Sequence, residues 1–137
     1  MKPERLLPMI LVIAGAAVCF YSYRQKTTVS EVPQEFQNDP AVVLFYKHQC
    51  VTCHWVTKLP EARGKLGPGL DNIGSRALEI DPEHKGEDFL KESLVDPAKV
   101  VRAGFVNGMP SFKDKLTERE LDLLVSWLLS LKEETKE

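Results

Sequence analysis

The chain has 137 residues, of which 18 are Lys or Arg and 20 are Asp or Glu, so its formal net charge is -2. This length allows one domain of modest size with a short appendage, and the 43% hydrophobic content is ordinary for a globular protein. The lack of a basic excess excludes the nucleic-acid-binding classes, whose affinity depends on clustered positive charge.

The first 24 residues predict a membrane anchor. Residues 6–23 carry no charged side chain, and a helix of about 18 residues is roughly 27 Å long, close to the hydrocarbon thickness of a bilayer. Tyr21, Tyr23 and Arg24 at the end of this run suit a membrane interface. We therefore expect residues 1–24 to form a single transmembrane anchor that is retained in the mature protein.

A cleavable signal peptide is the alternative for the same segment. Lys2 and Arg5 provide a basic start, and Ala14-Gly15-Ala16 has the small-residue pattern of a cleavage site. Cleavage would release a soluble protein with the same folded domain. Cys19 follows the bulky Val18, and we interpret it as an inert thiol in the apolar run rather than as a lipid acceptor.

A folded domain is predicted over residues 39–133, after a polar linker at residues 25–38 and before a polar tail at residues 134–137. Asp39-Pro40 is an N-cap followed by proline at the first helical position, and it predicts a helix that leads straight into Cys50.

The motif Cys50-Val51-Thr52-Cys53-His54 follows this helix, and it has the spacing that attaches a c-type haem covalently. The two cysteines can reach the two vinyl groups on one edge of the porphyrin, and His54 can then bind the iron. The alternatives are a redox dithiol and half of a zinc site. A zinc site needs a second Cys pair or a His pair, and neither is found, because the remaining cysteine is Cys19.

Two further helices are predicted after the motif. Gly86–Leu94 is a short helix that stops before Pro97, and Thr117-Glu118-Arg119-Glu120 is a capping box that begins a strong amphipathic helix to about Lys132. The remaining segments are rich in Gly and Pro and show no alternating strand pattern. The predicted fold class is all-α.

Met109 is the favoured second ligand of the iron. Gly108 and Pro110 fix a turn around its sulfur, about one helix before the end of the chain. A thioether would stabilise Fe(II) and raise the reduction potential. Four other residues are less favoured. His48 lies too close to the attachment motif, and His84 lies in a charged segment. Met1 and Met9 lie in the predicted anchor.

These elements resemble the class I cytochromes c in content and in order. The matching pieces are the helix with the Cys50–His54 motif, the segment Leu66-Gly67-Pro68-Gly69-Leu70, the turn around Met109, and the terminal helix. The resemblance covers residues 39–132, and it implies that the Pro68 carbonyl accepts a hydrogen bond from Nδ1 of His54. It also implies a close crossing of the first and last helices at a small residue, and Val42 at that position departs from the pattern.

The stretch from Glu92 to Phe112 is similar to the haem c domains fused to some second subunits of cytochrome oxidases, although no copper-site motif is present. The resemblance implies an electron carrier, not an enzyme, with one covalent haem c and with redox proteins, or a membrane respiratory complex, as its partners. Because bacteria attach haem c outside the cytoplasmic membrane, we expect a single-pass membrane protein with its haem domain in the periplasm. The alternatives are a haem enzyme or gas sensor with an open iron site, and a soluble shuttle after leader cleavage.

A mostly apolar haem pocket is expected, with electrons leaving through the edge near Cys50 and Cys53. Arg76 and Lys99 are candidates for pairing with haem propionates, but we favour solvated surface positions for both. The residues expected to line the pocket are Tyr46, Leu70, Phe89, Leu94, Phe105 and Leu124.

Overall fold

The computed structural model describes residue 13, residues 15–16, residues 18–19 and residues 31–132. Within these residues the regular structure is helical, and the strand-like pairing is limited to an isolated bridge between Trp55 and Arg63. The all-α prediction is therefore confirmed for the described part of the chain. Most of the predicted anchor, at residues 1–24, lies outside it, and the helical residues that are described include no segment long and apolar enough to cross a bilayer.

The first half of the domain contains a helix that breaks just before the Cys-X-X-Cys-His motif. A 3-10 turn, η2 (Gln34–Phe36), precedes α2 (Pro40–Lys47). The Asp39 side chain caps α2 by accepting hydrogen bonds from Ala41 N at 3.0 Å and Val42 N at 3.2 Å. Gln49 then adopts a left-handed conformation with φ of 60°, and α3 (Cys50–Cys53) begins as a separate turn of helix.

The break corrects the prediction that one continuous helix leads into Cys50. The backbone N–H of Gln49 turns back to the carbonyl of Tyr46 at 2.9 Å, which ends α2 tightly. The left-handed residue re-aims the chain, so that α3 runs in a new direction. The break thus sets the direction in which the two cysteines are presented.

The second half of the domain contains α4 (Ile73–Ile80), α5 (Glu87–Val95) and a 3-10 turn, η3 (Pro97–Val100). α5 confirms the short helix predicted before Pro97. α4 was not predicted, because it is only eight residues long and includes a glycine. Its buried residues are small or apolar: Ile73, Gly74 and Ala77.

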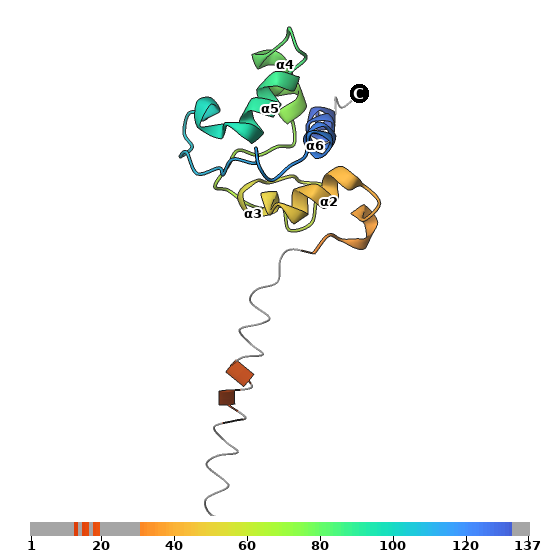
Figure 1. Ribbon diagram of the computed structural model, residues 1–137, viewed down its shortest axis with the longest axis vertical. Helices are drawn as coiled ribbons and strands as arrows, with labels where there is room; N and C mark the ends of the chain where they lie inside the picture. The colour runs from red at the N-terminus through yellow and green to blue at the C-terminus, as the bar shows by residue number, and fades with distance from the viewer. Residues whose placement is uncertain (1–12, 14, 17, 20–30, 133–137) are drawn as a thin grey trace, which may run out of the picture.

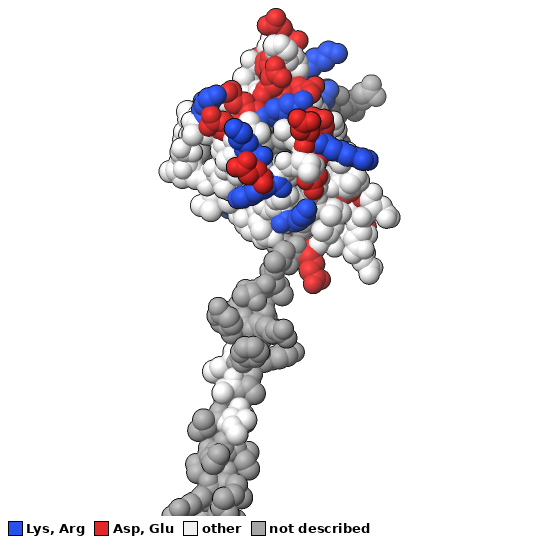
Figure 2. All heavy atoms as spheres, in the orientation of Figure 1, with Lys and Arg blue, Asp and Glu red and all other residues white. Residues whose placement is uncertain are grey.

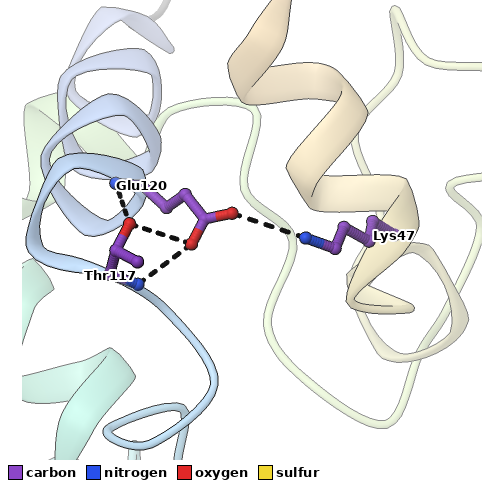
Figure 3. A network of polar contacts seen from close by, with 3 residues as sticks. All are labelled: Lys47, Thr117 and Glu120. Atoms are coloured by element: carbon purple, nitrogen blue, oxygen red, sulfur yellow. Dashed lines mark hydrogen bonds and ion pairs between the residues drawn. The ribbon is translucent and has the colours of Figure 1, made fainter.

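The terminal helix, α6 (Glu118–Ser130), begins with the predicted capping box. The hydroxyl of Thr117 accepts from Glu120 N at 3.3 Å, and the Glu120 carboxylate accepts from Thr117 N at 2.9 Å (Figure 3). α6 packs against α2, α4 and α5. Figure 1 shows the result, with α2 and α3 in one half of the domain, α4 and α5 in the other, and α6 beside both.

The core contains the contacts that hold α6 in place. The rings of Phe45 on α2 and Trp127 on α6 lie with their centroids 5.1 Å apart. Val42 on α2 is fully buried in the core, so a branched residue is accommodated at this position. The backbone of α4 lies directly against the end of α6, where Gly74 N donates to the Leu131 carbonyl at 2.8 Å. A Cβ atom at residue 74 would clash with the carbonyl of Leu129.

Candidate haem-binding site

A cavity of about 610 Å³ lies between the two halves of the domain. Its volume is within the usual range for sites that bind small molecules and cofactors. Most of its lining side chains are apolar, and they come from α2, α4, α5, α6 and the loops between them. They include Phe45, Leu70, Ile73, Phe89, Leu90, Leu94, Phe105, Phe112, Leu124 and Leu128.

Cys50 and Cys53 both line this cavity from α3. Their sulfurs are not joined in a disulfide, so both are free to react. Burial raises the pKa of the Cys50 thiol to about 12. A redox dithiol depends on a thiolate of lowered pKa, and the burial of Cys50 gives no support for one at this residue.

His54 follows α3 directly and faces the same cavity. Its Nδ1 lies 2.9 Å from the carbonyl oxygen of Pro68, which is the contact that the resemblance assigns to this proline. Burial lowers the pKa of His54, and the hydrogen bond to the Pro68 carbonyl opposes this shift. The arrangement favours a neutral imidazole with Nδ1 occupied, and it leaves Nε2 for a metal ion.

Gly67 provides the space that this imidazole needs. A Cβ atom at residue 67 would lie 2.5 Å from Cε1 and 2.8 Å from Nδ1 of His54. The Gly67 N–H donates to the Cys53 carbonyl at 2.9 Å, which holds the loop against α3. Only a glycine allows the backbone to approach the ring this closely.

Met109 lines the cavity and is half-buried against the core. The loop around it is attached to the end of α5 by two hydrogen bonds. Phe112 N donates to the Leu94 carbonyl at 2.9 Å, and the Ser111 hydroxyl donates to the Val95 carbonyl at 2.6 Å. The fold therefore brings residue 109 to the same cavity as residues 50, 53 and 54.

The less favoured ligand candidates occupy different places. His48 also lines the cavity, with its ring at an edge-on angle to Phe112, and its buried Nε2 has no hydrogen-bond partner among the described residues. His84 is an exposed residue away from the cavity, where Nδ1 lies 3.1 Å from Asp81 and 3.3 Å from Asp88. Met1 and Met9 lie outside the described residues.

Five of the six residues predicted to line the pocket do so, and the sixth prediction is wrong. Tyr46 is completely buried, and its hydroxyl donates to the carbonyl of Pro60 instead of facing the cavity. The neighbouring residue, Phe45, lines the cavity in its place. Successive residues of a helix point about 100° apart, so the direction of α2 decides which aromatic ring reaches the site.

The prediction that Arg76 and Lys99 lie on the solvated surface is wrong for Arg76 and confirmed for Lys99. Arg76 lines the cavity, its Nη2 donates to the Gly69 carbonyl at 2.6 Å, and its Nε is buried without a partner among the described residues. Lys99 lies on the exposed surface and pairs with Glu92 at 3.1 Å and Asp96 at 3.4 Å.

The residues that are present fit a haem c group. The cavity lining is mostly apolar, as a porphyrin requires, and the Arg76 Nε without a partner among the described residues suits a carboxylate. Cys50 and Cys53 would hold the group covalently, and His54 would bind the iron. Haem c bound in this way gives a protein a centre that takes up and releases one electron at a time.

A helical domain that presents a Cys-X-X-Cys-His motif to an apolar cavity is a c-type cytochrome domain, which acts as an electron carrier. Residues 40–128 match the family model described as cytochrome c oxidase, cbb3-type, subunit III, and the chain belongs to this family.

One curated relative is subunit 2 of the cytochrome c oxidase of Bacillus sp. (strain PS3). It is 34% identical over 91 residues, which make up 65% of this chain and 25% of the relative. The chain therefore spans about a quarter of that relative's length. No solved structure gives a significant match.

Proposed function

We propose that this protein is a membrane-anchored, single-haem cytochrome c that carries electrons at the periplasmic surface, as a subunit or partner of a respiratory complex. His54 and Met109, which both line the cavity, would bind its iron. The observation that carries the proposal is the cavity itself, because it collects Met109 with Cys50, Cys53 and His54. The apolar run at residues 6–23 supports the anchor. The similarity to an oxidase subunit supports a respiratory partner.

The mouth of the cavity is where we expect partners to dock. Leu66 and Val106 both line the cavity and are 71% and 78% exposed, respectively. Partner contact at this position would bring an electron donor or acceptor close to the cavity that Cys50 and Cys53 also line.

Optical spectra of membrane and soluble fractions test the proposal. We expect a low-spin c-type spectrum in the membrane fraction, with the ferric thioether-to-iron charge-transfer band. Met109→Ala should abolish that band, whereas His48→Ala, which changes a less favoured candidate for the second ligand that also lines the cavity, should leave it unchanged.

Three other outcomes would replace parts of this proposal. A high-spin spectrum that shifts with CO would mean an open iron site, and the protein would then be an enzyme or a gas sensor. A normal spectrum in the soluble fraction alone would mean a cleaved leader and a diffusing shuttle. A polypeptide mass without covalent haem would exclude the cytochrome itself.

A further inference from the structure

The contact between His54 and Pro68 is the first of three polar contacts that join residues 54–57 to residues 68–71. Leu70 N donates to the Trp55 carbonyl at 2.8 Å, and Thr57 N donates to Asp71 Oδ1 at 2.7 Å. Residues 54–57 therefore run beside residues 68–71, with polar contacts from residues 54, 55 and 57. Any shift between the two segments changes the distance from His54 Nδ1 to the Pro68 carbonyl.

A series of side-chain hydrogen bonds accompanies these contacts and joins Trp55, Thr57 and Asp71. The Trp55 indole N–H donates to the Thr57 hydroxyl at 2.9 Å, and this hydroxyl donates to Asp71 Oδ2 at 2.8 Å. Asp71 thus receives two hydrogen bonds from one residue, and bonds to a carboxylate are stronger than bonds between neutral groups. We call these three residues the Trp55–Thr57–Asp71 strut.

The strut holds the indole ring against the loop that contains Pro68. A Cβ atom at Gly69 would lie 3.7 Å from the Trp55 ring, which is ordinary van der Waals contact, so the ring covers the backbone just after the proline. Trp55 is 45% exposed. Burial alone therefore fixes its ring weakly, and the hydrogen bond to Thr57 determines where the ring lies.

We infer that the Trp55–Thr57–Asp71 strut positions the Pro68 carbonyl against His54 and so adjusts the reduction potential of the iron. The inference rests on the proposed function. A hydrogen bond at Nδ1 makes an imidazole a stronger donor to its metal, and a stronger donor favours Fe(III). Loosening the strut should weaken this hydrogen bond and raise the potential. Residues 55, 57 and 71 are positioning residues, since they act on the iron through Pro68 and His54.

Thr57→Val in the full-length holoprotein is the decisive variant. It keeps the β-branched shape, the backbone N–H and the charge of Asp71, and it removes only the hydroxyl that links Trp55 to Asp71. We expect the equilibrium constant for reduction to rise about threefold, which is roughly 28 mV at 59 mV per factor of ten. We also expect faster hydrogen exchange at Nδ1 of His54 in the reduced protein, measured by NMR. Thr57→Ser, which restores a hydroxyl, should return both values toward the wild type.

Thr117→Val is the matched control, because it also removes a threonine hydroxyl but breaks the capping box of α6. It should lower stability and leave the potential unchanged. If Thr57→Val shifts the potential no more than Thr117→Val, the strut is a passive surface contact and the inference fails. Trp55→Phe, which keeps an aromatic ring and loses the indole N–H that Thr57 accepts, gives the same test should Thr57→Val not fold. A wild-type protein without covalent haem would overturn the proposed function and this inference together, whereas a normal wild-type spectrum with silent variants overturns this inference alone.

Discussion

The imidazole of His54 is held between a hydrogen bond and a backbone surface. Pro68 accepts from Nδ1 on one edge, and the backbone of Gly67 lies against the ring. The position of this imidazole therefore depends on two consecutive residues of one loop. Of the two, Gly67 acts by having no side chain.

Gly67→Ala should displace His54 and destabilise the protein by about 1–3 kcal/mol, the usual cost of overpacking a well-packed site. The added Cβ would lie 2.5 Å from Cε1 of His54, and neither the ring nor the loop can move without breaking the contact to Pro68. Chemical denaturation of the purified protein measures the stability, and covalent haem per polypeptide measures the effect on the site.

Gly69→Ala is the control for this substitution. It adds the same methyl group two residues further along the loop, where the nearest atoms are 3.7 Å away on the Trp55 ring. We expect nearly normal stability and haem content. Equal losses in the two variants would show that the loop resists any added side chain, and the argument from His54 would then be wrong.

Much of the site could be predicted from residue identity, because several of its functional residues lie in short sequence motifs. The Cys50–His54 spacing and the Gly-Pro-Gly segment need no tertiary information. Arg76 and Tyr46 could not be placed in this way. The Arg76 guanidinium faces the cavity because the Gly69 carbonyl is there to accept from it, and Tyr46 turns away because α2 presents Phe45 to the cavity.

At the scale of elements, the start of α6 combines a cap with an ion pair to another helix. Thr117 and Glu120 form the capping box, and the same carboxylate lies 3.4 Å from Nζ of Lys47 on α2 (Figure 3). Hydrogen bonds from the Thr117 backbone and hydroxyl lower the pKa of Glu120, and Lys47 adds to the shift.

Thr117→Ala should lower the free energy of unfolding by about 1 kcal/mol, which is typical for the loss of an N-cap. Because the pKa of Glu120 is lower in the folded state, its contribution is present above its ordinary pKa of 4.5 and is lost as the pH falls through the folded value. The difference between wild type and variant should therefore shrink in acid. Urea denaturation at neutral pH and at about pH 4 checks both statements.

Lys47→Ala serves as the comparison. Lys47 is 60% exposed, so its pair with Glu120 is a surface ion pair with a small expected contribution, about 0.5 kcal/mol or less. A larger loss for Lys47→Ala than for Thr117→Ala would mean that α2 and α6 are joined mainly by this ion pair and not by the apolar contacts between them.

Some helices of this domain could be predicted from local sequence signals, and α4 could not. A capping box and an N-cap with proline are local signals, so α6 and the start of α2 could be predicted from the sequence. α4 has no such cap, and it depends on its contact with α6 at Gly74. The resemblance implies a small residue on the first helix, where this chain has Val42, whereas Gly74 on α4 lets the backbone of that helix lie against the end of α6.

At the scale of the whole molecule, the charge distribution does little to orient an approaching protein partner. Figure 2 shows acidic and basic side chains intermixed on one face, and the formal net charge of the chain is only -2. Several of these charges pair with each other, as Lys91 does with Glu87 at 2.7 Å and with Asp122 at 3.1 Å. A small net charge with paired surface charges gives little long-range electrostatic steering of a partner.

The cavity also makes the fold dependent on what fills it. Its walls come from both halves of the domain, and α6 is the main element that contacts both. The cavity opens to solvent at its mouth, so without a cofactor its apolar walls would either face water or collapse against each other.

The double variant Cys50→Ala/Cys53→Ala, which cannot attach haem, should accordingly keep its helices and lose its fixed packing. We expect far-UV circular dichroism close to that of the holoprotein, a weakened near-UV spectrum, and strong binding of the dye ANS. The near-UV signal should fall because Phe45 and Trp127 pack beside the cavity wall and lose their fixed geometry when it collapses. Cys19→Ala, which removes a thiol outside the cavity, should match the wild type in all three measurements. A double variant with a native near-UV spectrum and no ANS binding would mean that the two halves hold together without the haem, and that the cavity is a rigid, preformed site.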